Sequence, residues 1–421
     1  MNKLFVGIDI SLGDYKVVVL DQEGEDVIKP FAVDNNEPGT DELISSVLLC
    51  CKTQKTDKLF VGLESTSVYG WHVQHALADC PRLKPYKPAI ICFNPKLVEK
   101  FKKSLGNIGK DDWVDANAIA ERLRFGRLPK TCPVDFRYLA LQRLTRYRYH
   151  IVQNIVREKS YYLSNLFLKF SGMCQEQVFS NNFGNTATSL FHEYSTLEDI
   201  AASSLDELID FVVDHGKGRF KDPVSTAKKL KQAASNSYAL RPSMDKSLNF
   251  VIRSCLDNIR ALNTQKKSVE KIIKRQVKDF RNEFLCLDSV KGIGPTIAAG
   301  IISEIGGISR FDNDAALAKY SGIYWSKYQS GNFTADDTSL QRTGNSYLRY
   351  YFVQAAEQLR KYLPEYSDYY TRKFKESRTH QHKRALILTA RKAVRLIFAL
   401  LRDEKLYKPP AVKGDDLLNN K

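Results

Sequence analysis

The sequence predicts an α/β domain followed by an all-α remainder. Two observations carry this prediction. Short β-branched runs alternate with apolar-periodic segments up to about residue 130, whereas helical periodicity dominates after about residue 137. The chain has 421 residues, more than one compact domain usually holds. We therefore expect an α/β domain at residues 1–130, a helical linker and insertion with long, coiled-coil-like helices at 131–283, and a helical C-terminal domain at 284–421.

The first two strands are predicted at about residues 4–11 and 15–21. Both runs are apolar and β-branched, and the short link between them contains a glycine, which is typical of an antiparallel pair of strands. The first run also carries a carboxylate, Asp9, where an apolar residue is expected. An ionised carboxylate is costly to bury unless something pairs with it. A metal ion is one such partner, so Asp9 is the first candidate metal ligand.

The later elements of this domain follow a regular order. We expect a third strand at 31–33, a helix at 41–51, a strand at 59–64, a helix at 69–78, a strand at 89–93 and a helix that begins at Pro95. This order matches the ribonuclease-H-like (RuvC-like) fold, in which a three-stranded meander is extended by parallel strands. The fourth strand would then lie beside the first and parallel to it. Asp9 and Glu64 would be neighbours at the edge where open α/β sheets bind ligands.

A third group of acids lies at the start of a predicted helix that contains Ala116, Ile119 and Leu123. Asp112 aligns with the apolar stripe of that helix, and Asp115 lies at the edge of the stripe, so both would extend the face that packs on the sheet. Asp111 points further round, towards solvent. A simpler interpretation is that these acids only favour a helix N-terminus. The many basic residues between 84 and 130, Lys110 among them, flank the proposed cluster as an entering phosphate backbone would require.

The rest of the chain is predicted to be helical. Long helices are expected at about 137–170 and 245–280, and their apolar spacing suits an antiparallel hairpin or an intersubunit coiled coil. Small helices and loops are expected at 171–244. After residue 284 we expect a helix-hairpin-helix-like motif, a loop at 322–332, and helices at 347–359 and 385–401.

The turn of the helix-hairpin-helix-like motif contains Lys291, Gly292 and Gly294. Such a turn lets backbone N–H groups approach a phosphate at a helix N-terminus, which would make it a nucleic-acid-binding element. A tight turn between two core helices is an alternative interpretation of the same residues.

The composition indicates an acidic partner. Lys and Arg total 64 against 48 Asp and Glu, a formal charge of +16, and nucleic acid is the commonest partner of so basic a chain. No run approaches the length of a membrane-spanning helix and the N-terminus lacks a signal-peptide pattern, so we expect a cytoplasmic protein without a membrane partner. Eight cysteines without zinc-site spacing predict free thiols in a reducing compartment.

With these residues in place, the chain resembles transposases of the DEDD insertion-sequence family, which includes the pilin-gene invertase and the bridge-RNA-guided recombinases. Any one motif is common, but their joint order extends over nearly the whole chain. The motifs are Gly7-Ile8-Asp9, Leu63-Glu64-Ser65-Thr66, Lys110 through Asp115-Ala116, Gly292-Ile293-Gly294-Pro295, Ser330-Gly331, Gly344-Asn345 with Leu348-Arg349, and the stretch from His382 to Leu400.

This resemblance implies a catalytic site of four metal-binding acids and one serine. The acids fall on Asp9, Glu64, Asp112 and Asp115, and the serine nucleophile, which precedes a glycine, falls on Ser330. The family usually has a proline where Trp325 stands and often a second serine where Gln329 stands, so Ser330 is the only serine before that glycine.

The carboxylates would hold two Mg²⁺ ions, with Mn²⁺ as a substitute, because hard oxygen ligands without Cys or His favour Mg²⁺ over zinc. Serine attack on DNA would leave a covalent phosphoserine link that conserves the phosphodiester for rejoining.

The resemblance also implies the partners of this enzyme. They are donor and target DNA, a structured guide RNA that pairs with both, and further copies of the chain in a dimer or tetramer whose composite sites take the serine from a neighbouring subunit. Lys110, Lys291, Gly292, Gly294, Gly331 and Arg349 are the candidate nucleic-acid-binding residues.

Three other functions compete with this interpretation. A RuvC-like, structure-specific endonuclease would use the same acids but water as the nucleophile. A nucleic-acid-binding protein that keeps this fold without catalytic activity is a second alternative, but the presence of all four acids argues against it. A sugar or acetate kinase also begins with Gly-Ile-Asp but needs further glycine-rich phosphate loops, which we do not find at the right place.

Overall fold

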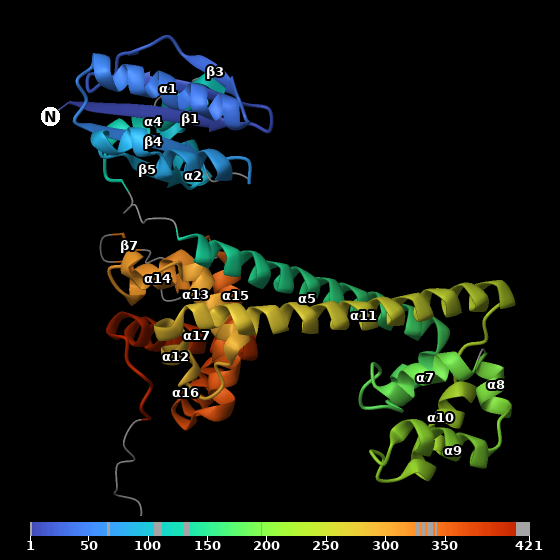
Figure 1. The fold of residues 1–421 in the computed structure, drawn as a ribbon. Coiled ribbons are helices and arrows are strands. Elements are labelled where there is room, and N and C mark those ends of the chain that lie inside the picture. The colour runs from blue at the N-terminus through green and yellow to red at the C-terminus, as the bar shows by residue number, and fades with distance from the viewer. Residues whose placement is uncertain are drawn as a thin grey trace, which may run out of the picture. The chain divides into compact units, whose positions relative to one another are not determined.

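The computed structural model describes residues 2–64, 68–104, 112–128, 135–194, 196–325, 329–330, 333–334, 340–341 and 343–409 (Figure 1). The chain divides into two compact units, residues 1–136 and residues 137–421. The first unit is built around a sheet, and the second is almost entirely helical.

The sheet of the first unit has five strands in the order β3-β2-β1-β4-β5. Strands β1 (Lys3–Ile10), β2 (Asp14–Leu20) and β3 (Phe31–Asp34) form the predicted antiparallel meander. Strands β4 (Lys58–Glu64) and β5 (Ala89–Phe93) extend it in parallel on the other side of β1. The predicted position of the fourth strand, beside the first and parallel to it, is therefore confirmed, and the order is that expected of a ribonuclease-H-like sheet.

Two apolar cores cover the two faces of this sheet because successive side chains of a strand point to opposite faces. One core packs helices α1 (Glu37–Thr53) and α2 (Trp71–Asp79), and the 3-10 turn η1 (Pro81–Tyr86), against Leu4, Val6 and Ile8 of β1. The other packs α3 (Pro95–Ser104) and α4 (Asp112–Phe125) against the face that carries Phe5. The result is a three-layered α/β/α unit with helices on both faces.

Helix α1 begins four residues before the predicted start. Asn36 is its N-cap, and the Asn36 side chain accepts a hydrogen bond of 2.8 Å from the backbone N–H of Gly39. Pro38 lies in the first turn, where its missing N–H costs nothing. This capping, and not apolar periodicity, decides where the helix begins.

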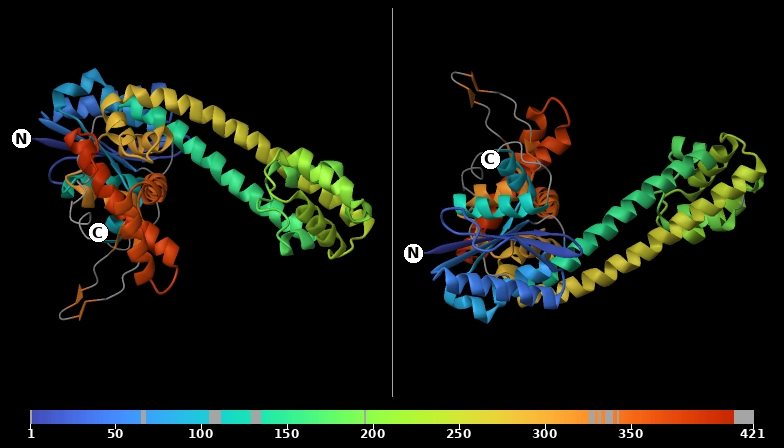
Figure 2. Two further views of the ribbon diagram at one scale, coloured as in Figure 1. Left: turned by 90° about the horizontal axis from the view of Figure 1, so that it is seen from below. Right: turned by 90° about the horizontal axis from the view of Figure 1, so that it is seen from above.

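The second unit contains the two predicted long helices, α5 (Phe136–Lys169) and α11 (Pro242–Gln276), the latter extended by the 3-10 turn η2 (Val277–Asp279). Ion pairs join them at two levels, Arg148 with Glu270 at 2.8 Å and Lys169 with Asp245 at 2.7 Å. Higher numbers on one helix pair with lower numbers on the other, so the two run antiparallel, as Figures 1 and 2 show. The hairpin interpretation of these helices is confirmed within the chain.

Five short helices lie at the far end of this hairpin (Figure 1). They share a core with Tyr162 and Leu166 of α5 and with Ile252 and Leu256 of α11. The prediction of small helices between residues 171 and 244 is therefore confirmed. The helices are α6 (Ser171–Gln175), α7 (Asn185–Glu193), α8 (Leu197–Ala202), α9 (Leu205–Gly216) and α10 (Pro223–Ser235).

The near end of the hairpin packs into a C-terminal helical bundle. Leu141 and Ile151 of α5 and Ile273 of α11 share one core with the bundle. Its elements are α12 (Arg281–Asp288), α13 (Pro295–Ile305), η3 (Ile308–Arg310), α14 (Asp314–Ser321), α15 (Ser346–Tyr362), α16 (Pro364–Glu376) and α17 (Gln381–Asp403).

Short strands lie within the loop predicted at residues 322–332 and just after it. Strand β6 (Tyr324–Trp325) pairs with β9 (Leu340–Gln341), and β7 (Gln329–Ser330) pairs with β8 (Phe333–Thr334), both antiparallel. Strands of two residues are too short for a periodic pattern, so the sequence could not predict them.

Two further predictions concern cysteines and membranes. All seven cysteines within the described part of the chain are free thiols. Among the described residues, no helix is both long and apolar enough to cross a membrane.

Candidate active site

The first two candidate acids lie at one edge of the N-terminal sheet, on neighbouring parallel strands. In the register of β1 and β4, Ile8 is opposite Leu63, so Asp9 and Glu64, the next residues, are adjacent. Both side chains lie on the face that α4 covers, because each is two residues beyond a glycine, Gly7 or Gly62, that contacts α4. The predicted adjacency of these two positions in the sheet is confirmed.

Helix α4 brings a third acid to the same edge. A Cβ atom on Gly7 would lie only 2.0 Å from the carbonyl oxygen of Ala116, so the backbone of α4 rests directly on strand β1. Asp115 immediately precedes Ala116 and is partly buried, with 32% of its side chain exposed. The close contact at Gly7 thus sets the carboxylate of Asp115 beside the ends of the two strands.

The electrostatics of Glu64 show that these acids influence one another. Burial, together with the negative charges of Asp9 and Asp115, raises the pKa of Glu64 to about 7, although the positive charge of Lys102 acts in the opposite direction. Around Glu64 the negative charges of Asp9 and Asp115 therefore exceed what Lys102 offsets, and a cation would relieve this repulsion.

Two lysines that were not among the predicted site residues lie at this cluster. Lys102 of α3 forms an ion pair with Asp115, and only 18% of its side chain is exposed. Lys16 of β2 is opposite Asp9 in the strand register and forms an ion pair of 2.7 Å with Asp14. A sequence signal exists for Lys16, which interrupts an apolar strand, whereas Lys102 is one of several lysines on the same predicted helix.

The donor set fits a hard divalent cation. Asp9, Glu64 and Asp115 offer only carboxylate oxygens, which suit Mg²⁺ or Mn²⁺ better than zinc. Among the described residues, however, no three acidic, His or Cys side chains converge into a complete metal site. The fourth predicted ligand is Asp112, the first residue of α4 and one turn before Ala116; its side chain lies outside what the structure describes.

The predicted nucleophile lies in the second unit. Ser330 belongs to β7, where it is opposite Phe333, and its side chain lies outside the described part of the structure. Lys110 and Gly331 also lie outside the described residues. The structure thus brings Asp9, Glu64 and Asp115 together and leaves the role of Ser330 a prediction.

The other candidate nucleic-acid-binding residues lie in the C-terminal bundle. Gly292 has φ of 104° in the turn between α12 and α13, and Gly294 is the N-cap of α13. The Lys291 ammonium lies 5.8 Å from the centre of the Tyr362 ring. Arg349 donates a hydrogen bond of 3.1 Å to the backbone carbonyl of Ser321. Two helices joined by a tight turn are thus present where a helix-hairpin-helix motif is predicted, while phosphate binding there stays a prediction.

Comparisons with known proteins support one class of activity. The DEDD_Tnp_IS110 transposase model matches residues 6–170, and the model of the transposase IS116/IS110/IS902 family matches residues 285–371. The chain is 24% identical over 416 residues to an uncharacterized 44.8 kDa protein of insertion element IS116 from Streptomyces clavuligerus, and the match covers 97% of each chain.

A second full-length relative is an uncharacterized 42 kDa protein of insertion element IS900 from Mycobacterium paratuberculosis, 23% identical over 96% of this chain and 97% of that protein. The two family models match the two ends of the chain that carry the candidate acids and the candidate serine. Together these matches support an IS110-type transposase of the DEDD class, a DNA-processing enzyme.

Proposed function

We propose that this transposase cuts and rejoins DNA by phosphoryl transfer, with Asp9, Glu64, Asp112 and Asp115 as metal ligands and Ser330 as nucleophile. The observation that carries the acidic half of the proposal is the meeting of Asp9, Glu64 and Asp115 at one sheet edge, where burial and the negative charges of Asp9 and Asp115 raise the pKa of Glu64. A carboxylate with a perturbed pKa, placed beside other acids at the end of parallel strands, is typical of a functional site.

The four acids would hold two Mg²⁺ ions, which when bound activate the attacking oxygen and stabilise the leaving one. Glu64 has to lose its proton to become a ligand, because only the carboxylate binds the cation. Lys102 would release Asp115 at the same time, because its ammonium group and the metal ion compete for the same carboxylate.

Ser330 would transfer DNA in two balanced steps. In the first, its hydroxyl oxygen attacks the phosphorus, the bond from phosphorus to the leaving sugar oxygen breaks, and the serine proton passes to solvent while the leaving oxygen gains one. In the second, a sugar hydroxyl of another strand attacks the phosphorus, the bond from phosphorus to the serine oxygen breaks, and the serine oxygen gains a proton while the attacking hydroxyl loses one. The number of phosphoester bonds stays constant, so rejoining needs no external energy source.

In this proposal the subunits form a dimer or tetramer. The serine of one subunit attacks DNA that is bound at the acids of a neighbouring subunit. The long helix α5 supports such pairing, because Val156, Leu163 and Phe167 on its surface are between 39 and 55% exposed and follow helical spacing. Apolar side chains in that pattern suit a contact with another helix.

A guide RNA that pairs with donor and target DNA completes the proposal. It rests on the resemblance to bridge-RNA-guided recombinases, and the net charge of +16 supports binding to a polyanion. Base pairing would then select the DNA, and the protein would supply backbone contacts and chemistry.

A gel assay tests the proposed function. The protein is incubated with Mg²⁺, RNA transcribed from the flank of its element, and labelled donor and target DNA, and a protease-sensitive DNA adduct is sought on denaturing gels. We expect an adduct that requires the RNA, disappears in Ser330→Ala and persists in Ser326→Ala, a serine four residues earlier in the same loop. Clean cuts without adduct that still require Asp9 and Glu64 would instead establish a RuvC-like endonuclease that uses water.

A further inference from the structure

The loop that carries Ser330, here called the serine loop and defined as residues 323–343, leaves and re-enters the helical bundle at a single point. The backbone N–H of Asn345 donates a hydrogen bond of 2.7 Å to the carbonyl of Tyr320. A Cβ atom on Gly344 would lie 2.5 Å from that same carbonyl oxygen and 2.9 Å from the backbone nitrogen of Gly322. Only glycine allows the two ends of the serine loop to approach this closely.

Asn345 has two separate functions at this point. Its side-chain oxygen caps helix α15 by accepting hydrogen bonds of 3.0 Å from the backbone N–H groups of Tyr347 and Leu348. Its side-chain nitrogen donates a hydrogen bond of 2.7 Å to Oε2 of Glu304. Capping uses the oxygen alone, so the contact with Glu304 is an additional constraint on the end of the serine loop.

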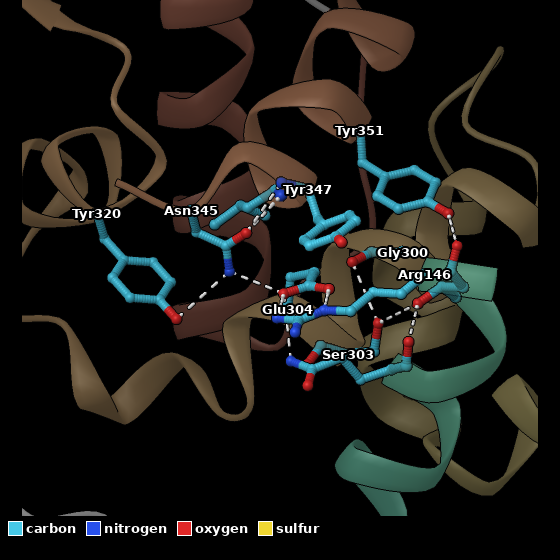
Figure 3. A network of polar contacts seen from close by, with 11 residues as sticks. Arg146, Gly300, Ser303, Glu304, Tyr320, Asn345, Tyr347 and Tyr351 are labelled. Atoms are coloured by element: carbon cyan, nitrogen blue, oxygen red, sulfur yellow. Dashed lines mark hydrogen bonds and ion pairs between the residues drawn. The ribbon is translucent and has the colours of Figure 1, made fainter. Parts of the chain in front are cut away.

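Glu304 is a fully buried carboxylate at the centre of a polar network (Figure 3). Arg146 of α5 binds it through two parallel hydrogen bonds of 2.7 and 2.9 Å, and Gln142 of the same helix donates a third of 3.2 Å. Figure 3 shows Arg146 of α5 and Asn345, the N-cap residue before α15, reaching the carboxylate from different parts of the fold. The network therefore joins α5, α13 and the end of the serine loop.

Stability alone is a poor explanation for this arrangement. A buried ion pair gains little over well-packed apolar residues of the same volume, because both charges must leave water. A carboxylate held by a bidentate arginine instead supplies a fixed direction for further hydrogen bonds. Two side-chain amides bond the carboxylate in this way, Gln142 of α5 and Asn345 at the end of the serine loop, and the bond from Asn345 is the shorter.

We propose that Glu304 is a positioning residue for the serine loop. Its carboxylate, oriented by Arg146, holds Asn345 and thereby fixes where the loop leaves the bundle. This inference rests on the proposed role of Ser330 as nucleophile. A displacement of about 1 Å at a reacting group can lower the rate by about a hundredfold, so anchoring at the loop's end is expected to affect the chemical step rather than DNA binding.

The test exploits the two functions of Asn345. In Asn345→Ser the serine hydroxyl still caps the helix, since serine is as good an N-cap as asparagine, but the donor to Glu304 is lost. The matched control is Asn313→Ser, because Asn313 caps α14 through a hydrogen bond of 2.9 Å from the backbone N–H of Ala316. We expect Asn345→Ser to lower the rate of adduct formation at saturating DNA at least about tenfold, with DNA affinity and melting temperature close to those of Asn313→Ser.

A second variant and a second measurement keep the test decisive. Glu304→Gln preserves the shape of the side chain, and the double variant Glu304→Gln with Asn345→Ser is expected to be no slower than the slower single variant, because both break one connection. Hydrogen exchange at residues 320–325 and 343–345 is expected to be faster in Asn345→Ser than in Asn313→Ser.

Two results would overturn the inference in distinguishable ways. If Asn345→Ser forms adduct as fast as Asn313→Ser while Ser330→Ala forms none, Glu304 does not position the loop and the proposed function stands. If Ser330→Ala still forms adduct, the proposed function itself fails, and the inference fails with it.

Discussion

At Glu64, burial and two neighbouring carboxylates oppose ionisation, and a bound cation would relieve both. Asp9 and Asp115 are the sources of the repulsion, and Lys102 already offsets part of it. The metal-free protein thus holds a carboxylate that titrates near neutral pH at the centre of its candidate site.

The first prediction concerns the pH dependence of stability without metal. The pKa of Glu64 is raised from 4.5 to about 7 on folding, so its stabilising effect is complete below the unfolded value and is lost as pH rises through about 7. In EDTA, we expect the melting temperature to fall more between pH 5.5 and 8.5 for the wild type than for Glu64→Gln. Equal falls in the two proteins would show that Glu64 titrates as an ordinary carboxylate.

The second prediction concerns Lys102, whose ammonium competes with a metal ion for Asp115. Lys102→Met is expected to bind Mn²⁺ more tightly, by about three- to tenfold, because a nearby positive charge is removed. Lys103→Met is the matched control, since that side chain is 74% exposed and pairs with Glu99. Titration calorimetry compares the variants, and an Mn²⁺ affinity of Lys102→Met no higher than that of Lys103→Met would exclude competition.

The sequence predicted the positions of these acids in the fold better than the positions of the neighbouring lysines. A carboxylate in an apolar strand is conspicuous, and parallel strand topology determines that Asp9 and Glu64 meet. Lysine is common on helix surfaces, so Lys102 is not distinguished from the exposed lysines around it until α3 packs on the sheet. Glu304 carries the same signal as Asp9, a lone acid in the apolar helix α13, and sequence reasoning overlooked it.

Among the elements, helix α4 determines the geometry of the candidate site. Its backbone rests on β1 at Gly7 and its side chains pack on β4 at Gly62, where a Cβ atom would lie 2.8 Å from Ile119. Helical periodicity predicted which face of α4 turns inward. How closely α4 approaches β1 depends on the absence of a side chain at Gly7. Helical periodicity gives no information about that distance.

The third prediction tests this contact. Gly7→Ala is expected to push α4 away from the sheet, because its Cβ would overlap backbone atoms of Ala116 and Ala120, and to destabilise the protein by about 3 kcal/mol. DNA cleavage should fall as well, since Asp115 moves with the helix. Gly13→Ala is the control, because its Cβ would meet only the Ser11 hydroxyl at 4.0 Å. Urea unfolding and the gel assay measure both effects, and a Gly7→Ala protein as stable and active as Gly13→Ala would contradict the account.

The short strands and the ends of the serine loop could not be predicted either, because they also depend on contacts that leave no periodic pattern in the sequence. The two ladders in the serine loop contain two residues per strand, which is too few for alternation to appear. The closure of the loop at Gly322, Gly344 and Asn345 depends on contacts between residues about twenty positions apart. Such contacts are set by tertiary packing and leave no local pattern.

For the whole molecule, the acids and the serine lie in different compact units, residues 1–136 and 137–421. From the length of the chain and the change of periodicity near residue 137 we expected three parts, residues 1–130, 131–283 and 284–421, and that division stays a prediction. The proposed reaction requires the two units to act together, and the resemblance implies that they come from different subunits.

The fourth prediction tests that arrangement by mixing inactive chains. Ser330→Ala retains the acids, and Asp9→Ala retains the serine. If the serine works together with the acids of a neighbouring subunit, each mixed dimer contains one intact site. In an equal mixture of refolded chains about half of the dimers are mixed, so about a quarter of wild-type activity should return. Recovery of no activity at any ratio would show that serine and acids act within one chain.

Mass spectrometry of the DNA adduct identifies the attacking side chain. After nuclease and trypsin digestion, we expect a nucleotide on the peptide of residues 328–342, with fragmentation placing the phosphoester on Ser330. The same peptide contains Thr334, Thr338 and Ser339, so the fragment ions discriminate among hydroxyls. A nucleotide on Tyr328 or any other residue, or cut DNA with no modified peptide, would contradict a serine nucleophile at this position.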